Sequence, residues 1–305
     1  MRARASAPGS PPSSPGKLES LSTRELLMTL QRADRQALAA VEVALPAVER
    51  AVEALVRSWR RGGRLVYVGA GTSGRLGALD AAECPPTFGV PDERVLSIIA
   101  GGPTALLNAQ EAAEDDGAAG RAAIDELLIG AADLVVALSA SGITAFTCAA
   151  LERAGQRGAT TVAITCHENS RVAELAEIPV VVAVGEEIID GSTRLKAGTA
   201  QKLVCNSLSS AAFIRLGRVC DRYMVAARTS SAKLERRAQA ILVALHACDA
   251  VEAEQQLEAA GGNLPTALLM ARTGIDRAAA ERFLQEADDN VPLALREAIL
   301  HSPGP

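Results

Sequence analysis

Five short apolar runs rich in β-branched residues alternate with helical patterns along the middle of the chain, and this alternation limits the possible folds more than any other feature. The runs are Leu65–Val68, Val95–Ile99, Leu134–Leu138, Thr161–Thr165 and Pro179–Val184. Helical spacing of apolar residues lies between them, at about 72–83, 104–116, 118–129, 144–156 and 170–177. Strands joined through helices form right-handed crossovers in a parallel sheet with helices on both faces. The sequence therefore predicts a three-layer α/β domain around a five-stranded parallel sheet.

The segments on either side of this alternation differ in composition. Residues 1–20 contain GSPPSSPG, and such Pro, Ser and Gly content predicts a disordered tail. Residues 21–60 show helical spacing, with Pro46 marking either a kink or a new helix start, and are expected to cover one face of the sheet. Residues 61–230 hold the sheet itself. Residues 231–305 are rich in Ala, Glu and Leu, which predicts a small C-terminal helical domain.

The C-terminal part contains an internal repeat. The pattern from Ala253 to Ala271 recurs 27 residues later, and each copy reads as helix, Asn-x-Pro turn, helix. Two copies are too few for a solenoid. The repeat is similar to the ubiquitin-associated-like (UBA-like) fold, and we expect it to pack on the core or to aid contacts between subunits. Recognition of a protein partner is the alternative.

Charge and cysteine content exclude several classes of protein. The net charge is −5 and the basic residues are spread along the chain, so neither nucleic acid nor an acidic membrane is an expected partner. The six cysteines lack CxxC or Cys/His spacing, which argues against structural zinc and against a disulfide framework. No apolar run reaches the ~18 residues of a membrane helix, and the N-terminus lacks the apolar region of a signal peptide. We expect a cytoplasmic protein with reduced thiols.

Two predicted strands end in loops rich in glycine and hydroxyl groups, GAGTSG after the first and S-x-S-G-x-T after the third. Each loop opens a predicted helix, whose free N–H groups favour an anion. Neither has the lysine of a P-loop, nor an acidic ribose binder about 20 residues on, so a phosphorylated sugar is expected rather than a nucleotide. For the first loop, the alternative is a tight turn without a ligand. The candidate residues are Thr72, Ser73 and Gly74, the first two as helix N-caps, and Ser139, Ser141, Gly142 and Thr144, the last as a cap.

The S-x-S-G-x-T loop on such a sheet resembles the sugar isomerase (SIS) domain, which binds phosphosugars. Further blocks resemble the N-acetylmuramic acid 6-phosphate etherases: GAGTSGRLGALDAAECPPTFGVP, IAGG at Ile99–Gly102, AEDD at Ala113–Asp116 and GSTRLKAGTAQKLVCN at Gly191–Asn206. The match runs from about residue 24 to 234. The resemblance implies a lyase that cleaves the lactyl ether of N-acetylmuramic acid 6-phosphate to N-acetylglucosamine 6-phosphate and D-lactate, in peptidoglycan recycling.

Elimination of such an ether needs a base for the C2 proton and an acid for the departing oxygen, but no metal or redox cofactor. The chain has only three histidines, so carboxylates are the natural candidates. Glu83 and Glu114 match the catalytic glutamates of the etherases. Glu83 lies before Pro85 at the expected end of its helix, which suits a proton donor. Glu114 is expected near the end of a helix that Thr104 opens, beside the carboxylates of Asp115 and Asp116. Which glutamate takes the C2 proton stays open.

The spacing of these residues poses a problem. Ser73 and Glu83 are ten residues apart on one predicted helix, which separates them by ~15 Å, about twice the reach from a phosphate to C2 of its sugar. Either the phosphate rests mainly on the second loop, or another subunit completes the site. The resemblance implies a homodimer with composite sites. Further substrate contacts are expected from Ser192 and Lys196, at the start of a long helix predicted from Gly191.

The chain departs from the etherases at a few positions. They commonly have Arg, Pro and Asn where this chain has Ile143, Ala145 and Ser231, so details of the third-strand loop and of the linker are expected to differ. Glu187, in the acidic stretch before the long helix, is expected at a loop edge rather than in a metal site. Two alternatives remain: a non-catalytic phosphosugar sensor on the same scaffold, and an aldose–ketose isomerase.

Overall fold

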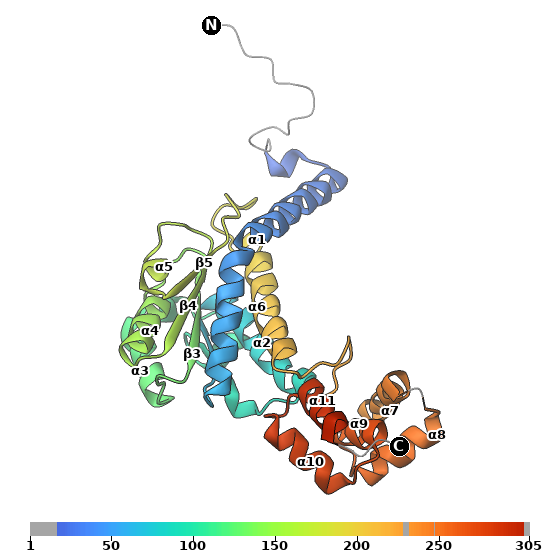
Figure 1. The fold of residues 1–305 in the computed structure, drawn as a ribbon. Coiled ribbons are helices and arrows are strands. Elements are labelled where there is room, and N and C mark those ends of the chain that lie inside the picture. Colours follow the sequence, from blue (N-terminus) through green and yellow to red (C-terminus); the bar gives the residue numbers. More distant parts are fainter. Residues whose placement is uncertain (1–16, 228–231, 247, 302–305) are drawn as a thin grey trace, which may run out of the picture.

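The computed structural model of the protein describes residues 17–227, 232–246 and 248–301. It shows a three-layer α/β domain followed by a helical C-terminal domain (Figure 1). Most of the predicted N-terminal tail and the position of Ser231 lie outside the described residues. The predicted domain boundaries therefore stay predictions.

The predicted five-stranded parallel sheet is confirmed. Its strands are β1 (Leu65–Gly69), β2 (Val95–Ile99), β3 (Leu134–Leu138), β4 (Thr160–Thr165) and β5 (Ile178–Val181). They are ordered β2-β1-β3-β4-β5, all parallel. The strand order reverses direction between β1 and β3: the chain runs from β1 to β2 on one side and from β3 to β4 and β5 on the other. Ligands of such sheets bind in the crevice beyond the carboxyl ends of the two strands at this point. The topology therefore directs attention to the loops that follow β1 and β3.

Helices cover both faces of the sheet. The helices of this domain are α1 (Thr23–Arg60), α2 (Gly71–Phe88), α3 (Gly117–Glu126), α4 (Ala145–Gln156), α5 (Arg171–Leu175) and α6 (Lys196–Arg215). Alternate strand residues point to opposite faces. Tyr67 and Val136 pack in one core with α1, α2 and α6, whereas Val66 and Val135 pack in the other with α3, α4 and α5. A core of buried side chains therefore packs helices onto each face of the sheet.

The N-terminal segment forms one helix of 38 residues, α1, which runs through Pro46 rather than restarting there. It opens with a capping box between Ser22 and Glu25. Proline removes one backbone hydrogen bond from a helix interior. Buried residues at helical spacing, such as Val41, Val48 and Leu55, pack α1 against the sheet and α6, and this packing offsets the loss.

The helix α2 continues beyond Glu83 to Phe88, so the prediction that proline ends it at Glu83 is wrong. Pro85 and Pro86 lie in its last turn, where only a few carbonyls lose a donor. Phe88 is buried with its ring centroid 4.9 Å from that of Phe213 on α6. This contact holds the last turn helical. Glu83 is therefore not at a helix end, and the argument from the helix dipole for a proton donor fails.

The C-terminal repeat forms the helices that the sequence predicts. They are α8 (Ala250–Ala259), α9 (Leu264–Thr273), α10 (Arg277–Glu286) and α11 (Val291–His301), preceded by α7 (Ala232–His246). Asn263 and Asn290 occupy the same place in the two copies, and their side chains accept hydrogen bonds from backbone N–H groups in the following turn. The N–H of Val291 donates to the Gly217 carbonyl beyond the end of α6. The domain is therefore anchored to the core at that point.

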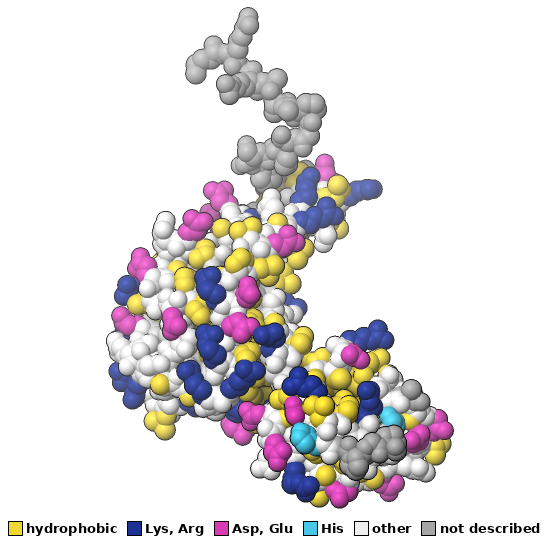
Figure 2. Space-filling view, in the orientation of Figure 1, with side chains coloured by type: hydrophobic (Ala, Val, Ile, Leu, Met, Phe, Trp, Pro, Cys, Tyr) yellow, Lys and Arg dark blue, Asp and Glu magenta, His cyan; other side chains and the backbone are white. Residues whose placement is uncertain are grey.

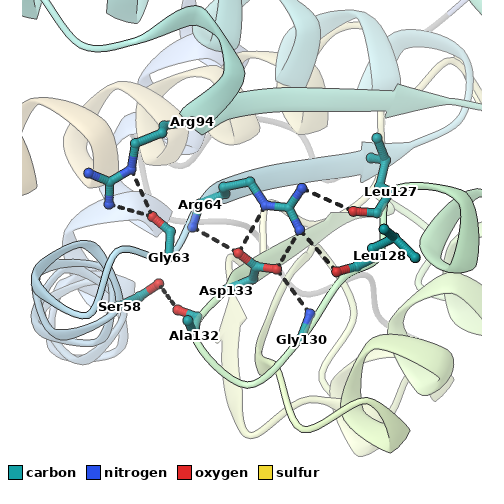
Figure 3. Close-up of polar contacts among 9 residues, drawn as sticks. All are labelled: Ser58, Gly63, Arg64, Arg94, Leu127, Leu128, Gly130, Ala132 and Asp133. Atoms are coloured by element: carbon teal, nitrogen blue, oxygen red, sulfur yellow. Dashed lines mark hydrogen bonds and ion pairs between the residues drawn. The ribbon is translucent and has the colours of Figure 1, made fainter.

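At the amino edge of the sheet, Asp133 ties the start of β1 to the loop before β3 (Figure 3). Its carboxylate accepts hydrogen bonds from the Arg64 backbone N–H and guanidinium and from the Gly130 N–H. The Asp133 side chain is only 7% exposed. Burial acts to raise the pKa of Asp133, but these hydrogen bonds outweigh it and hold the pKa below its ordinary value.

Asp133→Asn is expected to lower the free energy of unfolding by about 3 kcal/mol, because it breaks a largely buried ion pair. The contribution of the ionised carboxylate is present in full above the pKa of Asp in the unfolded chain, about pH 4, and is lost as the pH falls through the lower folded pKa. Denaturant unfolding between pH 7 and pH 3 measures both effects. Asp125→Asn, in a more exposed ion pair with Arg153, is the control, and an equal loss in both variants would contradict this role.

Candidate functional site

The loops after β1 and β3 lie side by side at the carboxyl edge of the sheet. The two strands pair along their whole length, with Gly69 opposite Leu138. A Cβ atom on Gly69 would lie 3.0 Å from the Leu138 carbonyl oxygen. The ends of β1 and β3 therefore approach each other closely where the two loops leave the sheet. The structure therefore brings together the two loops that the sequence predicted as anion sites.

In the first loop the helix begins one residue earlier than predicted. Its N-cap is Ala70, so Thr72 and Ser73 lie inside the first turn and are not caps. The Ser73 hydroxyl is buried and donates to the Gln201 side chain on α6 at 2.9 Å. The Gly74 N–H bonds to the Ala70 carbonyl. The N–H groups before Gly74 have no partner within the helix, which leaves the first turn able to receive an anion.

The second loop is held in shape by its own hydroxyl groups. The Ser139 hydroxyl accepts from the Gly142 N–H at 3.0 Å and lies 3.1 Å from the Thr144 hydroxyl. Thr144 is the N-cap residue of α4, as predicted, but its side chain makes no capping bond. Gly142 has φ +72°, and a Cβ there would lie 2.3 Å from that of Ser170. Only glycine fits this turn, which directs the start of α4 toward the crevice.

The long helix predicted from Gly191 begins only at Lys196, so this prediction is wrong by one turn. The Glu187 carboxylate accepts from the N–H groups of Lys196 and Ala197, at 3.1 and 2.9 Å, and starts the helix there. Ser192 lies in the turn before it, half-buried. Lys196 is buried, and its ammonium donates to the Val184 carbonyl at 2.8 Å. The Lys196 cation therefore binds the segment after β5.

A cleft of about 980 Å³ lies beyond the carboxyl ends of β3, β4 and β5. Its walls are the exposed Ser141 of the second loop, the loop 166–169 after β4, and the segment 183–197 that leads into α6. Burial raises the pKa of the Cys166 thiol in this wall to about 12, so it stays protonated at neutral pH. The cleft is wide enough for a sugar bound through the neighbouring loops.

Glu114 is not on an α-helix, contrary to the prediction of one helix over 104–116. The segment forms two 3₁₀ turns, η3 (Pro103–Leu106) and η4 (Glu111–Asp115). Gly101 and Gly102 precede them with positive φ, and Gln110 packs back on Gly101, so the chain turns instead of extending as a helix. Glu114 itself is exposed.

The Glu114 segment lies at the same edge of the sheet as both loops. It follows β2, whose neighbour is β1. Gly117, three residues after Glu114, lies against the first residue of α4, since a Cβ on it would be 3.5 Å from the Ala145 carbonyl oxygen. The turn η4 itself packs on α4. The structure therefore brings Glu114 beside the second loop.

Glu83 lies far along α2 from the first loop. It is exposed on α2, ten residues after Ser73, and α2 is one continuous helix, so the two are separated by about 15 Å along its axis. The helix runs from the carboxyl edge of the sheet toward the C-terminal domain (Figure 1). Glu83 therefore does not meet the loops of its own chain.

A buried polar cluster fixes α2, which carries Glu83, to its neighbours. The Asp80 carboxylate accepts from the Tyr67 hydroxyl on β1 at 2.7 Å and from the Ser209 hydroxyl on α6 at 3.1 Å. Burial raises the pKa of Asp80, and these hydrogen bonds oppose the rise. Because Asp80 is one turn from Glu83, the cluster fixes the position of that glutamate.

Two residues of this region were not singled out from the sequence. Gln201 holds the Ser73 hydroxyl, and Arg75 donates hydrogen bonds to the segment that precedes Glu114. Both belong to the blocks that resemble the etherases, but only the packing of α2 on α6 and on η3 reveals their contacts.

Within residues 17–227, 232–246 and 248–301, no group of three or more His, Cys, Asp or Glu side chains is placed to hold a metal ion. No helix in those same ranges combines the length and the apolar character needed to cross a membrane.

The chain is similar to proteins of known family. The glucokinase regulatory protein N-terminal SIS domain matches residues 47–154 and the SIS domain matches residues 118–211. A phosphoheptose isomerase from Francisella tularensis shares the fold, with a TM-score of 0.50 and 17% identity over 64% of this chain and 100% of that chain. At this identity the likeness concerns the fold alone.

Two relatives are much closer in sequence. N-acetylmuramic acid 6-phosphate etherase 2 of Vibrio cholerae is 44% identical over 251 residues, which are 82% of this chain and 82% of that protein. The N-acetylmuramic acid 6-phosphate etherase of Rubrobacter xylanophilus is 44% identical over 252 residues, 83% of this chain and 84% of that protein. The chain belongs to the N-acetylmuramic acid 6-phosphate etherase family.

Proposed function

We propose that the protein is an N-acetylmuramic acid 6-phosphate etherase, a carbon–oxygen lyase of cell-wall amino sugar recycling. The identity of 44% with etherases over four-fifths of the chain carries this proposal. The products are N-acetylglucosamine 6-phosphate and D-lactate. The arrangement of loops, cleft and Glu114 at one edge of the sheet supports it, because a phosphosugar anchored there extends toward a carboxylate.

The reaction is an elimination followed by addition of water. Opening of the sugar ring exposes an aldehyde at C1, which acidifies the C2 proton. A carboxylate removes that proton, the C2–C3 double bond forms, and the C3–O bond breaks as a carboxylic acid protonates the departing lactate oxygen. Water then adds at C3 and a proton returns to C2. Glu83 acts as proton donor and Glu114 is the second carboxylate, with the choice of C2 base left open.

The phosphate is held at the starts of α2 and α4. The N–H groups at the first turn of each helix point toward the crevice, and the exposed Ser141 adds a hydroxyl. Thr72, Gly74, Ser139, Gly142 and Thr144 shape these turns around the anion. Ser73, Ser192 and Lys196 are further proposed contacts of the substrate, and the Ser73 hydroxyl and the Lys196 ammonium also bond to Gln201 and to the Val184 carbonyl. The proposed route needs no metal or redox cofactor.

We infer that the active form is a homodimer in which each site takes Glu83 from one chain and Glu114 from the other. Exposed apolar side chains on α1 supply a surface for the second copy, and Figure 2 shows hydrophobic side chains gathered where α1 crosses the domain. A groove of about 450 Å³ between α1 and α6 continues this surface. An apolar surface of this kind favours a self-complementary contact. The exposed residues are Leu27, Met28, Leu30, Leu38, Val43 and Leu45.

The proposed location is the cytoplasm. All six cysteines are free thiols in the structure, four of them buried, and such thiols persist in a reducing compartment.

The test is incubation of the purified protein with N-acetylmuramic acid 6-phosphate and, separately, with other hexose 6-phosphates. Release of D-lactate from the first, with no isomerisation of the others, supports the proposal. Binding without lactate would indicate a phosphosugar sensor instead. Conversion of an aldose phosphate to a ketose phosphate would indicate an isomerase.

A further inference from the structure

Arg75 connects the first turn of α2 to the segment that carries Glu114. Its Nε donates to the Leu106 carbonyl at 3.1 Å, and its Nη2 faces the Asn108 carbonyl at 3.4 Å. Leu106 ends η3, and Asn108 lies between η3 and η4. Arg75 itself follows Gly74, within the turn that forms the first anion loop. One side chain thus joins two parts of the proposed site.

The segment between β2 and α3 has its other anchors mainly at its two ends. At its start, Thr104 donates to the Gly101 carbonyl, and Gln110 packs on Gly101, which has φ +83°. At its end, η4 packs on α4, Ala113 packs against the core, and Gly117 lies against α4. Between these points Leu107 is 89% exposed, whereas Ala105 is buried. Short 3₁₀ turns have weaker hydrogen bonds than an α-helix and do not hold a segment rigid by themselves.

The place of Arg75 in the first turn of α2 also links its two hydrogen bonds to the proposed substrate site. Arg75 is two residues after Ser73, so its backbone moves with the turn that faces the anion. A guanidinium carries donors in a fixed plane and can bind two carbonyls at once, which a lysine ammonium does not reproduce. The Arg75 side chain therefore holds the first loop and the segment that carries Glu114 at a fixed distance from each other.

We propose that Arg75 is a positioning residue for Glu114. Its guanidinium holds the 103–116 segment against α2, so that the reacting carbons of a phosphosugar bound at the first loop lie within reach of the glutamate. This inference rests on the proposed etherase function. It assigns to Arg75 no contact with the substrate. Removal of Arg75 therefore affects the chemical step and the order of the segment, and leaves substrate affinity largely intact.

The experiment compares Arg75→Ala, Arg75→Lys and a matched control, Arg272→Ala. Arg272 donates to the Leu245 carbonyl at 2.8 Å in the C-terminal domain, so the control removes the same kind of bond far from the site. Lactate release is measured as kcat and KM. Hydrogen exchange of peptides covering residues 103–116 is measured on the same proteins, without substrate.

Arg75→Ala is expected to lower kcat by about 100-fold with KM within about threefold, because a small misplacement of a catalytic group has effects of this size. Exchange in the 103–116 peptides is expected to rise in Arg75→Ala. Arg75→Lys is expected to recover only a small part of kcat, and Arg272→Ala to match the wild type.

Three results would overturn the inference. One is wild-type kcat in Arg75→Ala, and another is a rise in KM at unchanged kcat, which would indicate direct binding of the phosphate. The third is unchanged exchange in the segment. The exchange measurement does not depend on etherase activity, so it separates failure of this inference from failure of the proposed function, which absence of lactate from the wild type would reveal.

Discussion

Glu114→Gln is expected to lower the rate of lactate release by at least about 100-fold, since positioned acids and bases contribute factors of this size or more. Glutamine keeps the shape of the side chain but neither accepts nor delivers a proton at neutral pH. Because the Glu114 side chain is exposed in η4, the folded state is expected to persist. The measurement is steady-state lactate release, with thermal unfolding as a check on folding.

Asp115→Asn is the matched control for this variant. Asp115 is the next residue of η4 and is also exposed, so the variant removes one negative charge from the same turn. We expect its activity to stay within about threefold of the wild type, as for an ordinary surface change. Full activity in Glu114→Gln, or equal losses in both variants, would exclude a specific acid or base role for Glu114.

Co-expression of Glu83→Gln with Glu114→Gln is expected to restore activity that neither variant has alone. In a mixed dimer, one site receives Glu83 from the Glu114→Gln chain and Glu114 from the Glu83→Gln chain, and the other site has neither glutamate. A mixed dimer purified through two different tags is therefore expected to show about half of the wild-type activity, as two-fold symmetry requires. The reason is the position of Glu83 on α2, far from the loops of its own chain.

The control is the same purification with Glu83→Gln carried on both tagged chains, which is expected to stay inactive. A mixed dimer that forms but releases no lactate would contradict composite sites, because both glutamates would then come from one chain. A protein that is active as a strict monomer by light scattering would contradict the dimer itself.

The sheet and the C-terminal repeat could be predicted because their signals are local. Apolar β-branched runs between turn residues located β2 and β3 with the bounds that the structure has. Asn263 and Asn290 are each followed by proline two residues later, and they marked the starts of α9 and α11, the corresponding helices of the two copies. In both cases the residues that determine the element lie within it.

The failures have the opposite cause. The last turn of α2 survives two prolines because Phe88 packs on Phe213, which is 125 positions later in the chain. The segment over 104–116 has helical spacing, yet Gly101 and Gly102 just before it turn the chain, and it forms 3₁₀ turns. The start of α6 depends on Glu187, nine residues before Lys196. None of these contacts has a signature in the local pattern.

The sequence by itself determined the sheet, the positions of the two loops rich in glycine and hydroxyl groups, and the family, because strand spacing, glycine turns and helix starts are properties of neighbouring residues. Only the tertiary structure decided which of these residues meet. Parallel pairing of β1 with β2 and β3 brings the two loops and the Glu114 segment to one edge, while the continuous α2 carries Glu83 away from it. The physical reason is that packing between distant segments, and not local preference, sets where a helix begins, where it ends and what its side chains reach.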